Sequence, residues 1–121
     1  MELQDAIQER KSVRNFSKKK VDWRDIVECI DSVRYAPMAG NIFTPKFIVV
    51  LDRKKIGQIA DACQQEFVGQ VDYLVVVCSN PKLPTNEYGK QNSEIYTRQQ
   101  AGAAIQNFLL SLTEREIATC W

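Results

Sequence analysis

The sequence predicts one domain of mixed α and β structure in which helices cover a sheet. Two continuous apolar runs, KFIVVL at 46–51 and YLVVVC at 73–78, predict strands buried on both faces. Helical periodicities lie before, between and after these runs, so the expected order of elements is α, α, β, α, β, α, β. With 121 residues, of which 45% are hydrophobic, the chain is long enough to bury one core, and we treat residues 1–121 as a single domain.

Two helices and a basic stretch are predicted before the first strand. A short helix with one apolar face ends at Arg10, and the basic stretch follows it. The second helix begins after an Asp22 cap and ends near Tyr35, because Pro37 disfavours a helical conformation at the residue before it. Its apolar stripe consists of Trp23, Ile26, Val27, Ile30 and Val33. We interpret Trp23, like Phe108 further along the chain, as a core aromatic.

The remaining elements follow from caps and composition. The loop at 36–45, APMAGNIFTP, is too apolar for a solvated linker and is expected to pack. Asp52 is expected to cap a short helix after the first strand. A long helix at 91–115 has a small, apolar middle, in which Gly102 implies the close approach of a neighbour. Residues 117–121, IATCW, predict a third core strand, whose edge would favour aggregation unless something covers it.

Composition excludes several classes of function. Because the sequence has no histidine, it forms neither a Cys/His metal site nor a histidine-based catalytic triad, so an enzyme of this sequence would depend on a cofactor. A formal net charge of +1 argues against general nucleic-acid binding. The cysteines are widely spaced and include no C-x-x-C pair. Buried free thiols are therefore expected at Cys29, Cys63, Cys78 and Cys120.

The sequence also lacks the signals of a membrane or exported protein. No apolar run approaches the roughly 20 residues that cross a bilayer. The acidic start, MELQDAIQER, does not have the layout of a signal peptide, in which a charged segment precedes an apolar one. We therefore expect a soluble, cytoplasmic protein.

Positive charge is concentrated in the stretch that follows the first helix, QERKSVRNF at 8–16. In an extended backbone, side chains alternate between faces, which places Arg10, Ser12 and Arg14 on one side. Two forked guanidinium groups and a hydroxyl form a row suited to a phosphate, and Lys11 adds a further cation. The plainer interpretation is a solvated basic turn, because basic runs usually face solvent.

Several stretches together resemble the FMN-dependent nitroreductase family, in the family's order and over essentially the whole chain. The basic stretch matches the signature R-x-S-x-R-x-F, and the apolar loop is similar to the family's A-P-S-x-x-N loop. The later stretches resemble its A-P-V-V-I-V-V-C strand, its Y-x-x-Q-D-x-A-A-A-I-Q-N helix and its G-T-C-W strand. In this chain the five stretches are 10–16, 36–41, 72–78, 96–107 and 118–121.

The resemblance implies an α+β, nitroreductase-like fold of three layers, with a mixed sheet covered by helices. It also implies a homodimer with FMN at its interface, and an enzyme that passes hydride from NADH or NADPH through the flavin to nitroaromatic or quinone-like acceptors. No side chain is then catalytic, since the flavin carries the chemistry, and no metal, nucleic acid or membrane takes part. The implied FMN-binding residues are Arg10, Lys11, Ser12, Arg14, Pro37, Met38, Ala39, Asn41 and Gln65, with the loop residues coming from the partner subunit.

The chain departs from the family pattern at four points. Met38 replaces a loop serine, Gln100 replaces a frequent aspartate, and Glu116 replaces the glycine that usually closes the long helix. Family members also continue for some tens of residues beyond the C-W strand, so we expect a domain that is incomplete at its carboxyl end and lacks the usual C-terminal arm. Two alternatives therefore stay open. One is a degenerate, flavin-binding or dimerising fragment without turnover, and the other is an anion or nucleic-acid binding module that uses residues 10–20.

Overall fold

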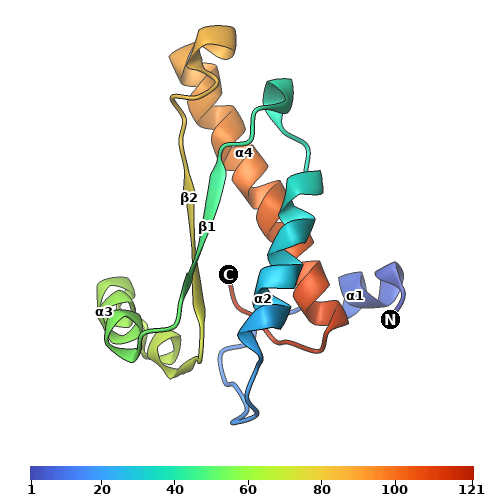
Figure 1. Cartoon of the computed structure of the whole chain (residues 1–121), viewed down its shortest axis with the longest axis vertical. Helices are drawn as coiled ribbons and strands as arrows, with labels where there is room; N and C mark the ends of the chain where they lie inside the picture. Colours follow the sequence, from blue (N-terminus) through green and yellow to red (C-terminus); the bar gives the residue numbers. More distant parts are fainter.

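The longest helix, α4 (Thr85–Glu114), runs the length of the molecule and carries the largest share of its core (Figure 1). The computed structural model describes residues 1–121. The other elements are α1 (Leu3–Glu9), α2 (Trp23–Ile30), β1 (Pro45–Val50), α3 (Arg53–Cys63) and β2 (Leu74–Ser79), with 3-10 turns η1 (Asp31–Tyr35), η2 (Ala39–Asn41) and η3 (Glu66–Gln70). A φ of 75° at Gly89 breaks α4, so its continuous part begins close to the predicted start at residue 91. The predicted α+β class is confirmed.

The predicted helix starts rest on side-chain caps that the structure contains. Asp22 accepts a hydrogen bond from the Arg24 backbone N–H at 2.9 Å, at the start of α2. Asp52 caps α3 by accepting from the backbone of Lys54 and Lys55 at 2.8 and 3.1 Å. Each cap satisfies amide groups that have no partner inside their own helix. The helical segment that begins with α2 continues through η1 and ends at Tyr35, as predicted from the proline that follows.

The two strands pair antiparallel, with Ile48 opposite Val76, and only one face of the sheet belongs to the core. The inward residues pack against the core cluster, and they are Phe47, Val49, Tyr73 and Val75. Figure 1 shows α2 and α4 on the same side of both strands. On the other face Ile48 is 40% exposed and Cys78 is exposed as well. The prediction of strands buried on both faces is therefore wrong for this chain, because its helices cover one face only.

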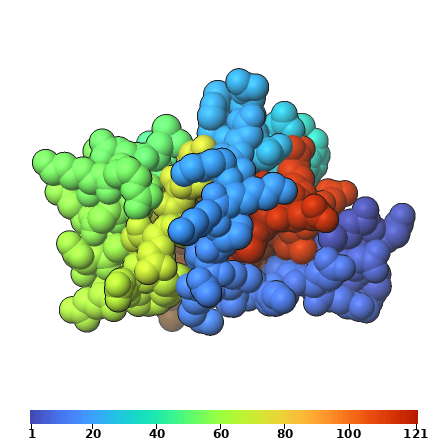
Figure 2. Space-filling view, turned by 90° about the horizontal axis from the view of Figure 1, so that it is seen from below, coloured from blue at the N-terminus to red at the C-terminus, as the bar shows by residue number.

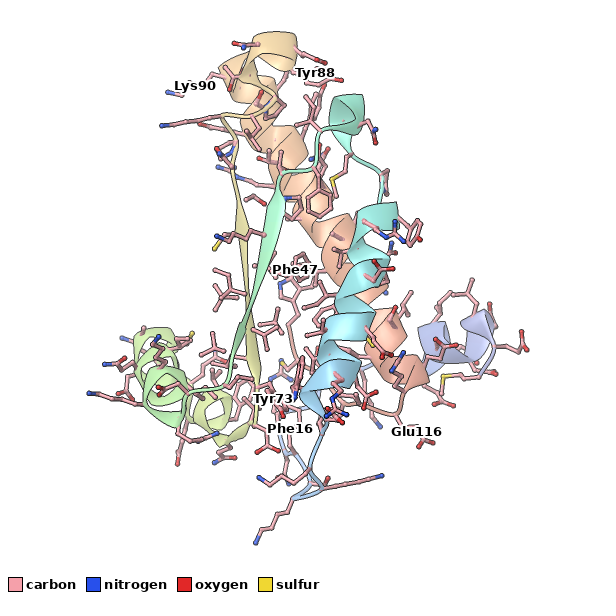
Figure 3. The ribbon with its side chains drawn as sticks, in the orientation of Figure 1. Phe16, Phe47, Tyr73, Tyr88, Lys90 and Glu116 are labelled. Atoms are coloured by element: carbon pink, nitrogen blue, oxygen red, sulfur yellow. The ribbon has the colours of Figure 1, made fainter.

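The core joins α2, η1 and α4 around an aromatic pair. The ring of Phe108 meets the edge of Phe47 across 5.7 Å between centroids (Figure 3), so the core role predicted for Phe108 is confirmed. The fully buried members of this cluster are Ile26, Cys29, Val33, Ala36, Ala104, Phe108 and Leu112. Trp23 is 51% exposed beside the Arg24 guanidinium, which contradicts the core role predicted for it.

One expectation for the ends of the chain is also wrong. The predicted first helix forms as α1 with Ala6 buried, although Leu3 is 69% exposed. Residues 117–121 form no core strand: a single parallel bridge joins Thr119 to Ser12. The indole of Trp121 lies 3.8 Å from where a Cβ on Gly102 would stand. That is an ordinary contact, so close packing in this chain does not require the glycine.

All four cysteines are free thiols, as expected, but only part of their predicted burial is observed. Cys29 is buried in the core and Cys120 is half-buried, whereas Cys63 at the end of α3 and Cys78 on β2 are exposed. The difference follows from the uncovered face of the sheet and from the short, one-sided packing of α3. None of the helices is both long enough and apolar enough to cross a membrane.

Candidate functional site

The basic stretch is joined to the end of the chain at Ser12, which forms a single parallel bridge with Thr119. The Val13 N–H donates to the Thr119 carbonyl at 2.8 Å, which holds the stretch against the end of the chain. Lys11 and Val13 line a hollow of about 460 Å³ beside the end of α4, whereas Arg10, Ser12 and Arg14 do not. This alternation matches the extended geometry. Lys11 therefore lies on the other side of the stretch from Arg10, Ser12 and Arg14, although the sequence had grouped these four residues together.

The cations of the row have no acidic partners within the chain. None of the five ion pairs in the molecule involves Arg10, Lys11 or Arg14. The stretch is anchored further along, where Lys20 pairs with Asp72 at 3.1 Å and the Tyr73 hydroxyl donates to the Val21 carbonyl at 3.0 Å. Unneutralised guanidinium groups beside a hydroxyl can bind an anion without first breaking an internal ion pair.

The apolar loop takes a sharply turned conformation around η2. Gly40 and Asn41 have φ values of 61° and 57°, which is a left-handed pair. A Cβ on Gly40 would stand 2.8 Å from the Tyr88 hydroxyl, so this glycine is required both for its φ and for the space it leaves. Pro37 and Asn41 are exposed, and Ala39 is half-buried. Met38 is half-buried and packs against the core cluster.

The side chain that holds this loop is Gln100, which the sequence analysis recorded only as a departure from the family pattern. It is 5% exposed. Its Oε1 accepts from the Ala39 N–H at 2.8 Å, and its Nε2 donates to Thr44 Oγ1 at 2.9 Å. A usable signal was present in the sequence: an amide directly before the small, apolar stretch of a helix can face the core, where it must find buried partners.

The row and the loop lie at opposite ends of the molecule. In Figure 1 the basic stretch, in blue, is at the lower end, and η2, in teal, is at the upper end beside the start of α4. Figure 3 labels Phe16 at the lower end and Tyr88 at the upper end. One copy of the chain therefore does not bring the predicted site residues together.

Gln65 lies at the same end as the basic stretch. It lines a hollow of about 560 Å³ between α3 and η3, together with Gln64 and Glu66. Seen from below in Figure 2, the mid-blue atoms of the segment that follows α1 lie between the green and yellow atoms of this region and the red end of α4, whereas the dark blue atoms of α1 lie beyond the red ones. The structure thus divides the predicted site residues into a lower group, with the basic row and Gln65, and an upper group in the loop.

The strongest electrostatic contacts of the lower end are structural. Arg115 donates to Asp25 at 2.8 Å and to Glu28 at 2.7 Å, which ties the end of α4 to α2. The hydrogen bonds that Arg115 donates, first to Glu28 and then to Asp25, raise the pKa of Arg115 above its ordinary value. Burial raises the pKa of the nearby Cys29 thiol, which keeps that thiol protonated at neutral pH. Neither group faces the row or the loop.

Comparison with curated proteins finds relatives over nearly the whole chain. A protein of Archaeoglobus fulgidus, provisionally named an NADH dehydrogenase/NAD(P)H nitroreductase, is 29% identical over 113 residues, which are 93% of this chain and 62% of the relative. An iodotyrosine deiodinase of Thermotoga neapolitana is 24% identical over 143 residues, covering 97% of this chain and 71% of the relative. The chain thus spans less than two thirds of the Archaeoglobus protein.

Solved structures share the fold over the full length of the chain. A nitroreductase family protein from Clostridium novyi has a TM-score of 0.85 and 27% identity, covering 100% of this chain and 69% of its own. A BluB-like flavoprotein from Clostridium difficile has a TM-score of 0.80 and 27% identity, covering 100% of this chain and 74% of its own. The model of the Nitroreductase family matches residues 7–68 and 56–121. Since these matches together include nearly every residue, the chain belongs to the nitroreductase family.

Proposed function

We propose that this protein is an FMN-dependent oxidoreductase that uses NADH or NADPH to reduce nitroaromatic or quinone-like acceptors. Family membership supports flavin chemistry. The observation that carries the proposal for this chain is the row of Arg10, Ser12 and Arg14, which lies on an extended backbone without internal ion partners. Such a row meets the need of a phosphate for fixed, charged hydrogen-bond donors.

The charges of the row suit the phosphate of FMN. Arg10 and Arg14 would hold the phosphate and the pyrimidine edge, with Ser12 as a neutral donor between them. The left-handed pair at Gly40 and Asn41 turns the loop sharply, with the side chains of Tyr88 and Glu87 beside Gly40. Bound FMN would supply the redox chemistry, accepting a hydride from the nicotinamide and delivering it to the acceptor.

The chain's own residues would bind and orient the cofactor and stabilise charge. Guanidinium groups beside the pyrimidine carbonyls would favour the negative charge that develops there on reduction, and they act more strongly where water is partly excluded. Lys11 would contribute from the opposite side of the stretch, and Gln65 would meet the polar edge of the ring. Pro37, Met38 and Ala39 would form an apolar wall, with Asn41 as a polar contact at its end.

Because the row and the loop lie at opposite ends of one chain, a pocket that uses both needs a second copy. We therefore propose a homodimer in which each FMN contacts the row of one subunit and the loop of the other. The free thiols favour a reducing compartment, and we place the protein in the cytoplasm. The relatives carry names as different as nitroreductase and iodotyrosine deiodinase, so the proposed acceptor depends on this chain's own loop and requires a direct test.

The test is a titration of the purified protein with FMN, followed by the quenching of flavin fluorescence. Saturable binding with one FMN per chain is expected, together with oxidation of NADH or NADPH that depends on an added nitroaromatic or quinone. A protein that does not bind FMN contradicts the proposal. Binding without any turnover leaves the degenerate, flavin-binding alternative instead. Steeply salt-dependent binding to DNA by flavin-free protein would favour a basic binding module.

A further inference from the structure

The amide of Gln100 connects α4 to the apolar loop by three hydrogen bonds. Besides the bonds to Ala39 and Thr44, its Nε2 lies 3.5 Å from the Ile42 carbonyl and donates to it. We propose that Gln100 is a positioning residue that sets the conformation of this loop before the cofactor binds. The cofactor part of this role rests on the proposed function, whereas the effect on the loop can be measured without flavin.

In this site the amide of Gln100 accepts and donates at once. The Ala39 N–H needs an acceptor, and the Ile42 carbonyl needs a donor. Thr44 is 4% exposed, so its hydroxyl depends on Gln100 for a partner. A carboxylate in this place would lack the donor, and an aliphatic side chain would lack both functions.

The hydrogen bonds of Gln100 lie on both sides of the left-handed part of the loop. They attach at Ala39 on one side and at Ile42 and Thr44 on the other, so Gly40 and Asn41 lie between them. Asn41 is held at a φ of 57°, a left-handed conformation that asparagine adopts more readily than most residues with a Cβ. The bonds on either side of this pair hold it in that conformation.

Fixing the loop in advance has a direct consequence for binding. A segment that is already ordered loses little conformational freedom when a ligand arrives, so more of the contact energy becomes affinity. Gln100 does not contact the proposed row at the other end of the chain, and its contribution would act through the loop alone. Loss of the amide should therefore loosen the loop first and weaken FMN binding as a result.

The experiment compares four variants in hydrogen exchange and in FMN titration. Gln100→Ala removes all three bonds, and Thr44→Val removes one bond at nearly constant shape. Thr44→Ser keeps the hydroxyl, and Gln99→Ala changes the adjacent, exposed glutamine of the same helix as the matched control. We expect Gln100→Ala to speed exchange of the Ala39 amide by about 10-fold to 100-fold, the range expected for loss of buried hydrogen bonds.

In FMN titrations, Gln100→Ala should raise the Kd about tenfold and Thr44→Val by a smaller factor, whereas Thr44→Ser and Gln99→Ala should stay within about twofold of wild type. Amides of β1 serve as the internal reference in the exchange experiment. If exchange in β1 rises as much as at Ala39, the amide has only a general structural role and the proposal is overturned. If Gln100→Ala does not fold, Thr44→Val carries the same test.

The two proposals fail in distinguishable ways. If wild-type protein binds FMN and Gln100→Ala binds it equally well, the positioning role is overturned and the proposed function stands. If wild-type protein does not bind FMN, the proposed function fails and the cofactor role of Gln100 fails with it. An Ala39 amide that exchanges no faster in Gln100→Ala than in wild type overturns the effect on the loop whatever the flavin result.

Discussion

The two ends of the molecule hold their candidate site residues in opposite ways. At the upper end, the loop around η2 is attached to α4 by a buried amide and rests on Tyr88. At the lower end, the row of Arg10, Ser12 and Arg14 is joined to its neighbour by one backbone bridge and faces solvent without acidic partners. The loop is therefore ordered by the fold, whereas the row keeps charges that no group in the chain neutralises.

Under the proposed function, this difference would divide FMN binding between the two ends of the molecule. A planar, mostly apolar ring gains from a wall whose shape is already set. A phosphate gains more from charge, which long side chains can deliver from an exposed segment. Substitutions in the row should accordingly change binding and spare stability, whereas substitutions in the loop should change stability as well.

The largest expected effect is on affinity at the lower end. Replacing both arginines in the variant Arg10→Ala/Arg14→Ala should weaken FMN binding by about 100-fold or more, because hydrogen bonds from charged groups contribute roughly 1.5–3 kcal/mol each. The free energy of unfolding in urea should change by less than about 0.5 kcal/mol, since neither side chain is packed in the core.

The control is Lys18→Ala/Lys19→Ala, which removes two exposed charges that lie shortly after the basic stretch. Its FMN affinity should fall by no more than a few-fold, through the general field of the stretch. If both double variants weaken binding equally, total charge matters and the specific row does not.

Next in size is the stability cost of filling the apex of the loop. Gly40→Ala should lower the free energy of unfolding by about 1–3 kcal/mol, since the left-handed φ disfavours a side chain and the new methyl would crowd the Tyr88 hydroxyl. Urea denaturation measures this change. Gly57→Ala is the matched control, because Gly57 is helical with open space around it. In that variant the free energy of unfolding should rise by about 0.5–1 kcal/mol.

Adding Tyr88→Phe to Gly40→Ala tests the contribution of the hydroxyl. Removing this group should return part of the lost stability if it crowds the new methyl, whereas the Glu87 carboxylate, whose Oε2 lies 2.9 Å from the same Cβ position, remains in both variants. A Gly40→Ala variant as stable as wild type would show that the upper loop is no better fixed than the lower row.

A smaller gain in stability is expected at the lower end, where α4 turns into the segment that supports the row. Glu116 has a φ of 60°, and the Ile117 N–H donates to the Leu112 carbonyl at 2.9 Å around it (Figure 3). Glu116→Gly should raise the free energy of unfolding by about 0.5–1 kcal/mol, because glycine adopts this conformation without strain.

Urea denaturation also checks this prediction, with Gln106→Gly as its opposite control. Gln106 is an exposed residue in the middle of α4, where a glycine should lower the free energy of unfolding by about 1 kcal/mol. If Glu116→Gly is destabilising, contacts of the Glu116 side chain outweigh the strain of its backbone.

A last difference, which involves no substitution, is expected in thiol reactivity between the core and the lower end. Cys29 is 2% exposed, and burial raises its pKa, so it should be the slowest of the four cysteines to react with N-ethylmaleimide at neutral pH. Cys120 lies in the segment held by one bridge and should react about tenfold faster or more. Mass spectrometry after timed labelling measures both rates. Equal rates would mean that the lower segment opens no more readily than the core.

Local signals predicted the positions of most elements and the identity of the family. Asp22 and Asp52 are caps whose partners lie two or three residues away, so short-range chemistry decides them. The left-handed position at Glu116 was likewise visible as a glycine position occupied by another residue. For the candidate site, the sequence singled out the row and the loop by motif, and the placement of Arg10, Ser12 and Arg14 on one side followed from assuming an extended backbone.

What the sequence by itself determined is the type and order of the elements up to the long helix, together with the charge of the row. Only the tertiary structure decided which face of β1 and β2 is covered, because an apolar run does not reveal how many helices will reach it. It also decided that Gln100 holds the loop, 56 residues from Thr44 along the chain. Finally, it placed the row and the loop at opposite ends of α4. Each motif describes only its own short segment, whereas the length and direction of the helix set the distance between the two segments.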